Sequence, residues 1–252
     1  MKRICLLATL FLISISTCLA NVKLPKLISD GMVLQRDVKI PIWGWASPGE
    51  KITITFKGKK YRTSTSLDGK WTVTLPKMEA GGPYNMSISG DNILDVKDIL
   101  IGDVWLCTGQ SNMVHELDIH DVAYEYEIKN ANNPHIRHFK IPTTTSISGP
   151  QDDLAGGEWL KAVGEDIRPF SAVAYFFAKK IYEKYHVPIG LVNASVGGTP
   201  IEAWTPKEGF KNFPDILKIL SLTISTASEY FNLAINITSW KTQTCARAEI
   251  EH

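Results

Sequence analysis

The sequence predicts an α/β protein in two parts, a small antiparallel β-sandwich followed by a domain built on a parallel sheet. Between residues 21 and 97, short stretches alternate apolar and polar residues, as strands with one buried face do. From residue 98 to about 220, continuous apolar runs alternate with helical patterns, which indicates strands buried on both faces. Two polar loops also follow apolar runs directly, at the strand ends where active sites of α/β folds gather.

Residues 1–20 have the pattern of a secretory signal peptide. Two basic residues precede an apolar stretch from Ile4 to about Ile15, and Ala20 is the expected last residue before cleavage. The stretch is short for a membrane span. Lipid attachment at Cys18 is the alternative, because ISTC loosely resembles a bacterial lipobox. We therefore expect a secreted or periplasmic protein, with an outer-membrane lipoprotein as the other possibility.

The overall charge of the chain is nearly balanced. Lys2 and Arg3 leave with the signal, so 25 Lys and Arg remain against 26 Asp and Glu, a formal charge of −1. This gives no electrostatic reason to expect nucleic acid or an anionic membrane as partner. No spacing of cysteine and histidine suggests a metal site. Cys107 and Cys245 remain as a possible pair, although Cys107 in DVWLC reads as a buried strand residue.

The predicted β-sandwich occupies residues 21–97. The stretches VKIPIWGWA and KITITFKG alternate with period two. In SLDGKWTVTLP, the pair Asp68-Gly69 predicts a tight hairpin turn, and the residues on one face of the following strand are Trp71, Val73 and Leu75. Short strands at this spacing predict an antiparallel sandwich.

The α/β pattern begins with a buried strand from Ile99 to Cys107. Helix is possible in NMVHELDIHDVAYEYEIKNAN, and HIRHFKIP predicts another strand. SAVAYFFAKKIYEKYH predicts an amphipathic helix with Tyr175 and Phe176 on its apolar side. VPIGLVNAS predicts a further buried strand, and VGGTPIEAWTP the loop after it.

In these loops, Ser111 and the pair Gly197-Gly198 each have a chemical and a structural interpretation. Ser111, in TGQSNM, is either a nucleophile at a sharp strand-to-helix turn, where its N–H can donate to an oxyanion, or a helix N-cap. Gly197-Gly198 either lets backbone N–H groups approach a ligand or forms an ordinary turn.

GDVWLCTGQSNM, together with FSAVAYFFAKKIYEKYHVPIGLVNASVGGTPIEAWTP, resembles the bacterial sialate O-acetylesterase family, a branch of the SGNH (GDSL-like) hydrolases. The segment LPKLISDGMVLQRDVKIPIWGWASPGEKITITF is similar to that family's N-terminal β-domain. The resemblance implies an SGNH-hydrolase-like three-layer parallel-sheet domain over residues 98–220, partial at its C-terminal end, preceded by the β-sandwich. Residues 221–252 stay unassigned.

The resemblance also implies site residues and a reaction. Ser111 matches the nucleophile, and Gly198 matches a backbone oxyanion donor, with Asn193 at the start of the same loop and Gln110 beside the nucleophile. Trp204 forms either a sugar-facing wall or part of the core. The implied protein is a secreted carbohydrate esterase that removes O-acetyl groups from sugars through an acetyl-enzyme. Sialic acid is the first-choice substrate, with xylan or another glycan as the alternative, and neither metal nor organic cofactor is required.

A serine nucleophile needs a base that is itself oriented by a third group. The family's Asp-x-x-His block and its QGE-x-N-like segment are not found in the 252 residues. His115, four residues after Ser111, is one candidate base. His252 follows Glu249 by three residues, a spacing we interpret as coincidence at a chain terminus.

These missing blocks support a second interpretation, in which the chain is a catalytically incomplete sugar-binding or interaction protein. Of the other histidines, we expect His120 and His135 to be exposed, His138 to lie in a strand and His186 to lie at a helix end. Arg168 and Lys207 are either a clamp for a substrate carboxylate or solvated surface charges.

Overall fold

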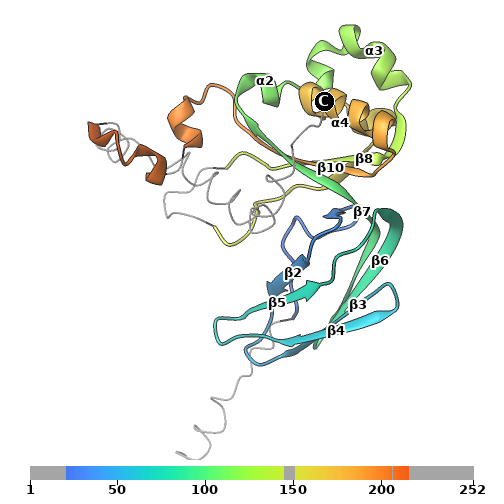
Figure 1. The fold of residues 1–252 in the computed structure, drawn as a ribbon, viewed down its shortest axis with the longest axis vertical. Helices are drawn as coiled ribbons and strands as arrows, with labels where there is room; N and C mark the ends of the chain where they lie inside the picture. The colour runs from blue at the N-terminus through green and yellow to red at the C-terminus, as the bar shows by residue number, and fades with distance from the viewer. Residues whose placement is uncertain (1–20, 145–150, 206, 216–252) are drawn as a thin grey trace, which may run out of the picture.

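The computed structural model describes residues 21–144, 151–205 and 207–215 (Figure 1). The main sheet has eight strands, in the order β4-β3-β6-β7-β10-β8-β9 with β1 paired to β7 beside this path, and β2 and β5 form a separate two-stranded sheet. The strands are β1 Val33–Gln35, β2 Ile40–Trp45, β3 Lys51–Phe56, β4 Lys59–Ser64, β5 Lys70–Leu75, β6 Gly81–Ser89, β7 Ile93–Gly109, β8 Asn132–Lys140, β9 Trp159–Val163 and β10 Ile189–Ser195. The helices are α2 Ser111–Val114, η1 Leu117–His120, α3 Asp121–Lys129, η2 Gly164–Ile167, α4 Ala172–Tyr185, η3 Ile201–Trp204 and η4 Lys207–Phe210.

β7 joins the two parts of the fold. Its N-terminal half pairs antiparallel with β6 as far as Ile101, and its C-terminal half, from Asp103 to Gly109, pairs parallel with β10. The predicted boundary between residues 97 and 98 therefore falls inside one continuous strand (Figure 1). The division into two domains stays a prediction, but backbone hydrogen bonds run from one part into the other.

The helix predicted from SAVAYFFAKKIYEKYH is confirmed as α4. Ser171 is its N-cap, and the Ser171 Oγ accepts a hydrogen bond from the Ala174 N–H at 3.3 Å. The buried side of α4 and Ile128 of α3 pack on one face of the parallel strands. The strand residues in this core are Cys107, Ile136, Ile189 and Leu191. Cys107 is thus a buried strand residue, as expected.

The opposite face of these strands packs against N-terminal residues. Phe139 and Val192 share a core with Met32 and Val33, and Trp159 joins them from the edge strand β9. α2, α3 and α4 all lie on the other side of the sheet (Figure 1). The described residues therefore form a mixed α/β arrangement, with β9 antiparallel to β8. The second helical layer of the predicted three-layer domain stays a prediction.

The turn at Asp68-Gly69 is present, but the hairpin predicted around it is wrong. The Gly69 N–H donates to the Ser66 carbonyl oxygen, and Gly69 has φ +77°. However, β4 pairs with β3 and β5 pairs with β2, so this turn carries the chain from one sheet to the other. A turn signal specifies local geometry and leaves the pairing partner open. The predicted buried face of β5 is confirmed, with Trp71, Val73 and Leu75 turned inward.

A buried arginine fastens the α/β strands to the N-terminal residues. Arg137 of β8 has a side chain that is 2% exposed. Its guanidinium donates to the carbonyl oxygens of Gly31 at 2.7 Å and Asp98 at 2.6 Å, and to the Asp98 carboxylate at 2.9 Å. Because a buried guanidinium is tolerable only when its donors are paired, these contacts fix where the three segments sit.

Several predictions fall outside the described residues, namely the signal peptide with Cys18, and the tail 221–252 with Cys245, Glu249 and His252. Among the described helices, none is long and apolar enough to cross a membrane.

Replacing Arg137 with Met should strongly destabilise the protein. The carbonyl oxygens of Gly31 and Asp98 would lose their donors in a buried place, so we expect the free energy of unfolding to fall by about 3 kcal/mol. Urea denaturation measures the loss. As a control, Arg168→Met removes an exposed guanidinium paired with Glu165 and should have a far smaller effect. Equal effects of the two substitutions would contradict the proposed fastening role.

Candidate active site

Ser111 stands where the central strand β7 gives way to helix. β7 ends at Gly109, and Ser111 is the first residue of the short helix α2. The N-cap of α2 is Gln110, whose side chain accepts the Ser111 N–H at 3.1 Å. The interpretation of Ser111 as the capping residue is therefore wrong, and its exposed hydroxyl is not needed to cap the helix.

Gln110 also accepts a hydrogen bond from the Ser111 Oγ, at 2.7 Å. Its side-chain oxygen thus takes both donors of Ser111, the N–H and the hydroxyl. Gln110 is exposed, so water can replace these two hydrogen bonds when its side chain turns. A carbonyl oxygen of a ligand would gain access to the Ser111 N–H once this amide turned away.

The two loops predicted to share a site do meet. β10 lies beside β7 with Ser195 opposite Gly109, and the N–H of Val196 donates to the Gly109 carbonyl oxygen at 3.0 Å. A Cβ placed on Gly197 would lie 3.7 Å from the Ser111 Oγ. The loop after β10 therefore borders the serine hydroxyl directly.

Gly198 is needed for its backbone conformation. It has φ +75°, in the left-handed region that residues with side chains rarely adopt, and a Cβ there would meet no atom within 4 Å. The residue is exposed next to Gly197. The role of Gly198 as an oxyanion donor stays a prediction.

Asn193 lies within the buried strand predicted from VPIGLVNAS, and not at the start of the loop where the family resemblance placed it. It sits inside β10 and is 1% exposed. Its Oδ1 accepts a hydrogen bond from the Ser195 Oγ at 2.6 Å, and its Nδ2 is buried without a partner among the described residues. The apolar run of β10 continues past this polar residue because the Asn193 backbone pairs with Cys107 and Lys140 on both sides. Asn193 thus supports the strand end.

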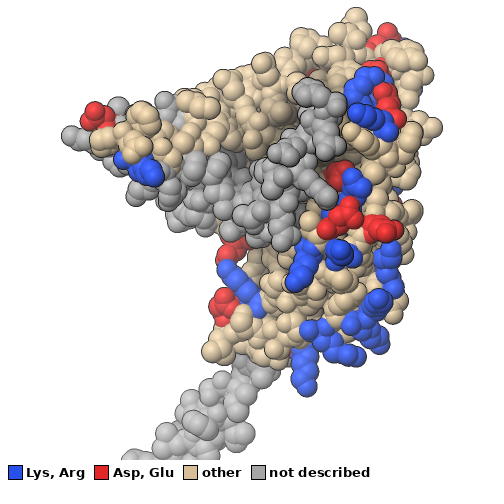
Figure 2. Space-filling view, in the orientation of Figure 1, with Lys and Arg blue, Asp and Glu red and all other residues tan. Residues whose placement is uncertain are grey.

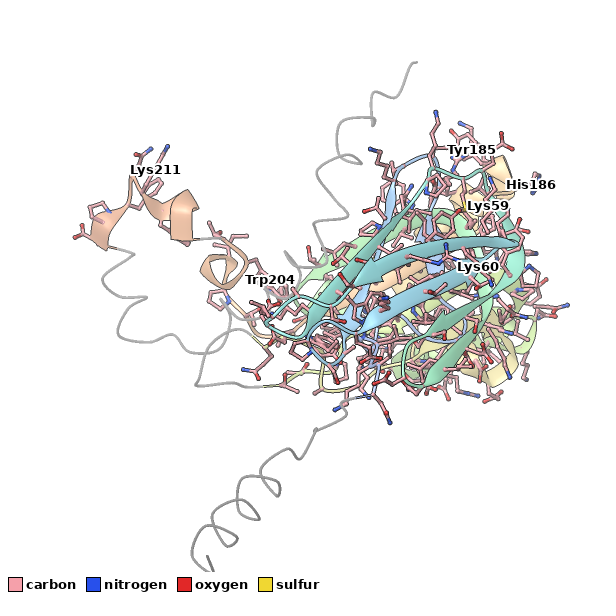
Figure 3. The ribbon with its side chains drawn as sticks, turned by 90° about the horizontal axis from the view of Figure 1, so that it is seen from below. Lys59, Lys60, Tyr185, His186, Trp204 and Lys211 are labelled. Carbon is pink, nitrogen blue, oxygen red and sulfur yellow. The ribbon has the colours of Figure 1, made fainter. Side chains whose placement is uncertain are left out.

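Trp204 braces the glycine loop. Figure 3 labels Trp204, whose side chain is half-buried. Its Nε1–H donates to the Thr199 Oγ1 at 2.8 Å. The Thr199 Oγ1 in turn donates to the Val196 carbonyl oxygen, also at 2.8 Å. Sequence reasoning missed Thr199, although a hydroxyl residue just after two glycines is a known signal for a side-chain bond to nearby backbone.

His115 is placed close to the serine turn without contacting its hydroxyl. The His115 N–H donates to the Ser111 carbonyl oxygen at 3.0 Å. The imidazole instead stacks on that of the exposed His120, with ring centroids 4.6 Å apart. Its Nε2 is buried and has no hydrogen-bond partner among the described residues. In this arrangement His115 does not act on the Ser111 hydroxyl as a base.

His138 is unsuited to proton transfer. It lies in β8, as predicted, and stacks on Phe170 with centroids 4.7 Å apart. Burial, with a smaller contribution from the charge of Lys140, lowers the pKa of His138 to about 3, so its ring stays neutral near pH 7. His186 ends α4 as predicted, whereas His135 is half-buried against Tyr182, contrary to the expected exposure.

The remaining predictions concern charges and cysteine. Arg168 pairs with Glu165 through its Nε, so its part in a carboxylate clamp stays a prediction, and the side chain of Lys207 lies outside what the structure describes. Burial raises the pKa of the Cys107 thiol to about 12, so this thiol is not a nucleophile near neutral pH. Within the described ranges, no three His, Cys, Asp or Glu side chains gather as a metal site would require.

Comparison with known proteins gives a consistent family signal. Residues 101–230, just over half of the 252, match the family model described as carbohydrate esterase, sialic acid-specific acetylesterase. Human sialate O-acetylesterase is 33% identical over 206 residues, covering 73% of this chain and 39% of the human protein. The rat sialate O-acetylesterase is 34% identical over 204 residues, covering 73% and 37%. The chain thus spans about two fifths of the length of these relatives.

A solved structure resembles the fold as well. A carbohydrate acetylesterase from Xanthomonas citri superposes with a TM-score of 0.71 at 43% sequence identity. The match covers 75% of this chain and 43% of that one.

His138 should make stability depend on pH. Below about pH 6.5 the unfolded chain binds a proton at this residue that the folded protein excludes until about pH 3. This residue therefore lowers the free energy of unfolding by about 1.4 kcal/mol per pH unit as pH falls through that window. His138→Leu should remove this slope, gaining about 2 kcal/mol relative to wild type between pH 7 and pH 5. Urea unfolding at both pH values tests it, with the exposed His120→Leu as control; identical slopes would refute the assignment.

Proposed function

Because this chain belongs to the sialic acid-specific acetylesterase family of carbohydrate esterases, we propose that it acts in the hydrolysis of O-acetyl esters on sugars, with Ser111 as nucleophile. The observation that carries the proposal is the meeting of two loops at one exposed oxygen. The Ser111 Oγ stands at the carboxyl end of β7, and the glycine loop after β10 borders it at Gly197. Carboxyl ends of neighbouring parallel strands are where α/β enzymes place their chemistry.

In the proposed reaction, the Ser111 Oγ attacks the carbonyl carbon of the acetyl group and gives its proton to a base. The tetrahedral intermediate collapses with departure of the protonated sugar hydroxyl, and water then releases acetate from the acetyl-enzyme. The N–H groups of Ser111 and Gly198 stabilise the oxyanion, an effect worth about 3 to 4 kcal/mol per donor. Gln110 must first turn away, since its side-chain oxygen holds the Ser111 N–H. The chemistry calls for no cofactor.

The sugar is proposed from the family and the relatives. Sialic acid is the first choice, because the description of the family model names sialic acid and the names of the relatives contain sialate. Acetylated xylan or another glycan is the alternative, and acetate release from each substrate separates them. We also propose that residues 1–20 direct the chain to the periplasm or outside the cell, with lipid attachment at Cys18 as the variant case.

One observation favours a second, non-catalytic function. The Ser111 hydroxyl donates to Gln110, and within the described part of the chain no imidazole or carboxylate accepts it. A chain in this state would bind an acetylated sugar at the two loops without turnover. Saturable binding of O-acetylated sialic acid with no acetate released distinguishes this function from the esterase.

Ser111→Ala should abolish hydrolysis. Because the substitution removes the attacking oxygen, we expect the rate of acetate release from O-acetylated sialic acid and from 4-nitrophenyl acetate to fall at least about 100-fold. The exposed serine Ser64, on β4, provides the matched control Ser64→Ala, which should keep the full rate. Hydrolysis that survives Ser111→Ala would exclude Ser111 as the nucleophile. His115→Gln in the same assay tests whether this imidazole serves as the base after rotating.

Gly197 gives a graded test of the space around the Ser111 hydroxyl. An alanine Cβ would lie at an ordinary contact distance of 3.7 Å from the Oγ, whereas the methyl groups of valine would crowd the path of a substrate. We expect Gly197→Ala to change kcat/KM less than about 3-fold and Gly197→Val to lower it at least about 10-fold. Because the residue is exposed, Tm should hardly change in either variant. Equal kcat/KM values for the two variants would mean that the loop does not border the reacting group.

A further inference from the structure

The hairpin of β3 and β4 concentrates positive charge. Residues 51–64 contain five Lys and Arg and no Asp or Glu, whereas the whole chain has 27 against 26. The five cations, all exposed, are Lys51, Lys57, Lys59, Lys60 and Arg62. Figure 2 shows Lys and Arg side chains gathered over this end of the molecule. β4 is the edge strand of the main sheet, and Figure 3 shows Lys59 and Lys60 on it. We call these five residues the cationic hairpin.

The charges of the cationic hairpin are not neutralised. Within the described residues none of the five forms an ion pair, although cations elsewhere do, such as Lys70 with Asp152 and Lys179 with Glu127. Lys57 donates to the Tyr84 hydroxyl at 3.0 Å, a neutral partner that leaves its charge in place. Unpaired cations on one edge create a local positive potential that attracts anions.

Strand register places hydroxyl groups beside two of these cations. β3 turns Ile52, Ile54 and Phe56 into the core, so Thr53 and Thr55 point to the other face. Arg62 pairs with Thr53 and Lys60 with Thr55, and on the other side of β3 Thr53 pairs with Ser89 and Thr55 with Ser87. Two parallel rows result, each a cation followed by two hydroxyls; on β7 the Lys60 row ends at the exposed Asp95 and the Arg62 row at Ile93, so the cationic side of the face is the β4 edge. Lys60 and Arg62 are about 7 Å apart along the strand.

We propose that this face of β4, β3 and β6 binds a carboxylate-bearing glycan, a chain of acidic sugars, at a place separate from Ser111. Cations complement the carboxylates, and the hydroxyl rows can both donate to and accept from sugar hydroxyls. β3 and β4 lie at the opposite end of β7 from Ser111 (Figure 1). The choice of an acidic sugar rests on the proposed function, whose first-choice substrate is sialic acid. Bound here, a long acidic glycan would stay near the enzyme between encounters with Ser111.

The test measures binding of polysialic acid to the full chain by titration calorimetry. We expect binding that weakens at least about 5-fold from 50 to 300 mM NaCl, because exposed charges are screened by salt. The double variant Lys60→Gln, Arg62→Gln should weaken binding at least about 5-fold. The matched control Lys184→Gln, Lys211→Gln removes two exposed cations elsewhere and should leave binding within about 2-fold.

A second pair of variants identifies the ligand class. Thr53→Val with Thr55→Val removes two hydroxyls without changing charge or shape, and should weaken binding of polysialic acid at least about 3-fold while leaving binding of polyglutamate unchanged. No binding of polysialic acid at 50 mM NaCl, or binding insensitive to Lys60 and Arg62, overturns the proposal. The glycan assignment is overturned if the affinities for polysialic acid and polyglutamate depend equally on Lys60 and Arg62 and not on the hydroxyls. It is also overturned if single-stranded DNA or anionic vesicles bind more tightly than polysialic acid.

The same preparations separate this proposal from the proposed function. Hydrolysis of 4-nitrophenyl acetate should be unchanged in the Lys60→Gln, Arg62→Gln variant, and Ser111→Ala should still bind polysialic acid. Binding without hydrolysis would count against the esterase alone. Hydrolysis without binding would count against the glycan face alone.

Discussion

The backbone pairing of β7 is the constraint on which the rest of the structure depends. Seventeen residues in one strand carry antiparallel pairing to β6, a short parallel contact with β1 and parallel pairing to β10. Because β7 is one continuous strand, its N-terminal half fixes the position of the β-rich part and its C-terminal end fixes the position of Ser111. Arg137 locks the junction from the side, with its guanidinium satisfied by carbonyl oxygens from two other segments. The turn that carries Ser111 is therefore attached to β7, the longest of the described strands.

Two polar side chains are buried in the parallel strands of the sheet. Asn193 lies in β10 and His138 in β8, and the Asn193 Nδ2 and both ring nitrogens of His138 have no partners among the described residues. Asn193 still holds Ser195 at the end of β10, where the glycine loop begins. The loop is then fastened by Thr199 and Trp204. These hydrogen bonds support the loop that borders the Ser111 hydroxyl at Gly197.

Much of the fold follows from local pattern, and the failures have identifiable causes. The helix α4 was predictable because its apolar spacing is long and regular, and the strand β10 because it contains a continuous apolar run. The hairpin at Asp68-Gly69 was not, because a turn sets only local backbone geometry and the pairing of β5 with β2 is a long-range choice. The family resemblance placed Asn193 at the start of the loop, whereas sheet pairing on both sides keeps it inside β10.

The sequence by itself determined the family, the succession of strand and helix, and the serine and glycines that belong together, since these depend on residue type and spacing. Tertiary structure alone decided that Gly197 borders the Ser111 hydroxyl, that Gln110 rather than Ser111 caps α2, and that β7 serves both parts of the fold. It also decided that Lys60 and Arg62 share a face with the hydroxyls of β3 and β6. The physical reason is that contacts between segments distant in sequence depend on register and packing, which no single segment encodes.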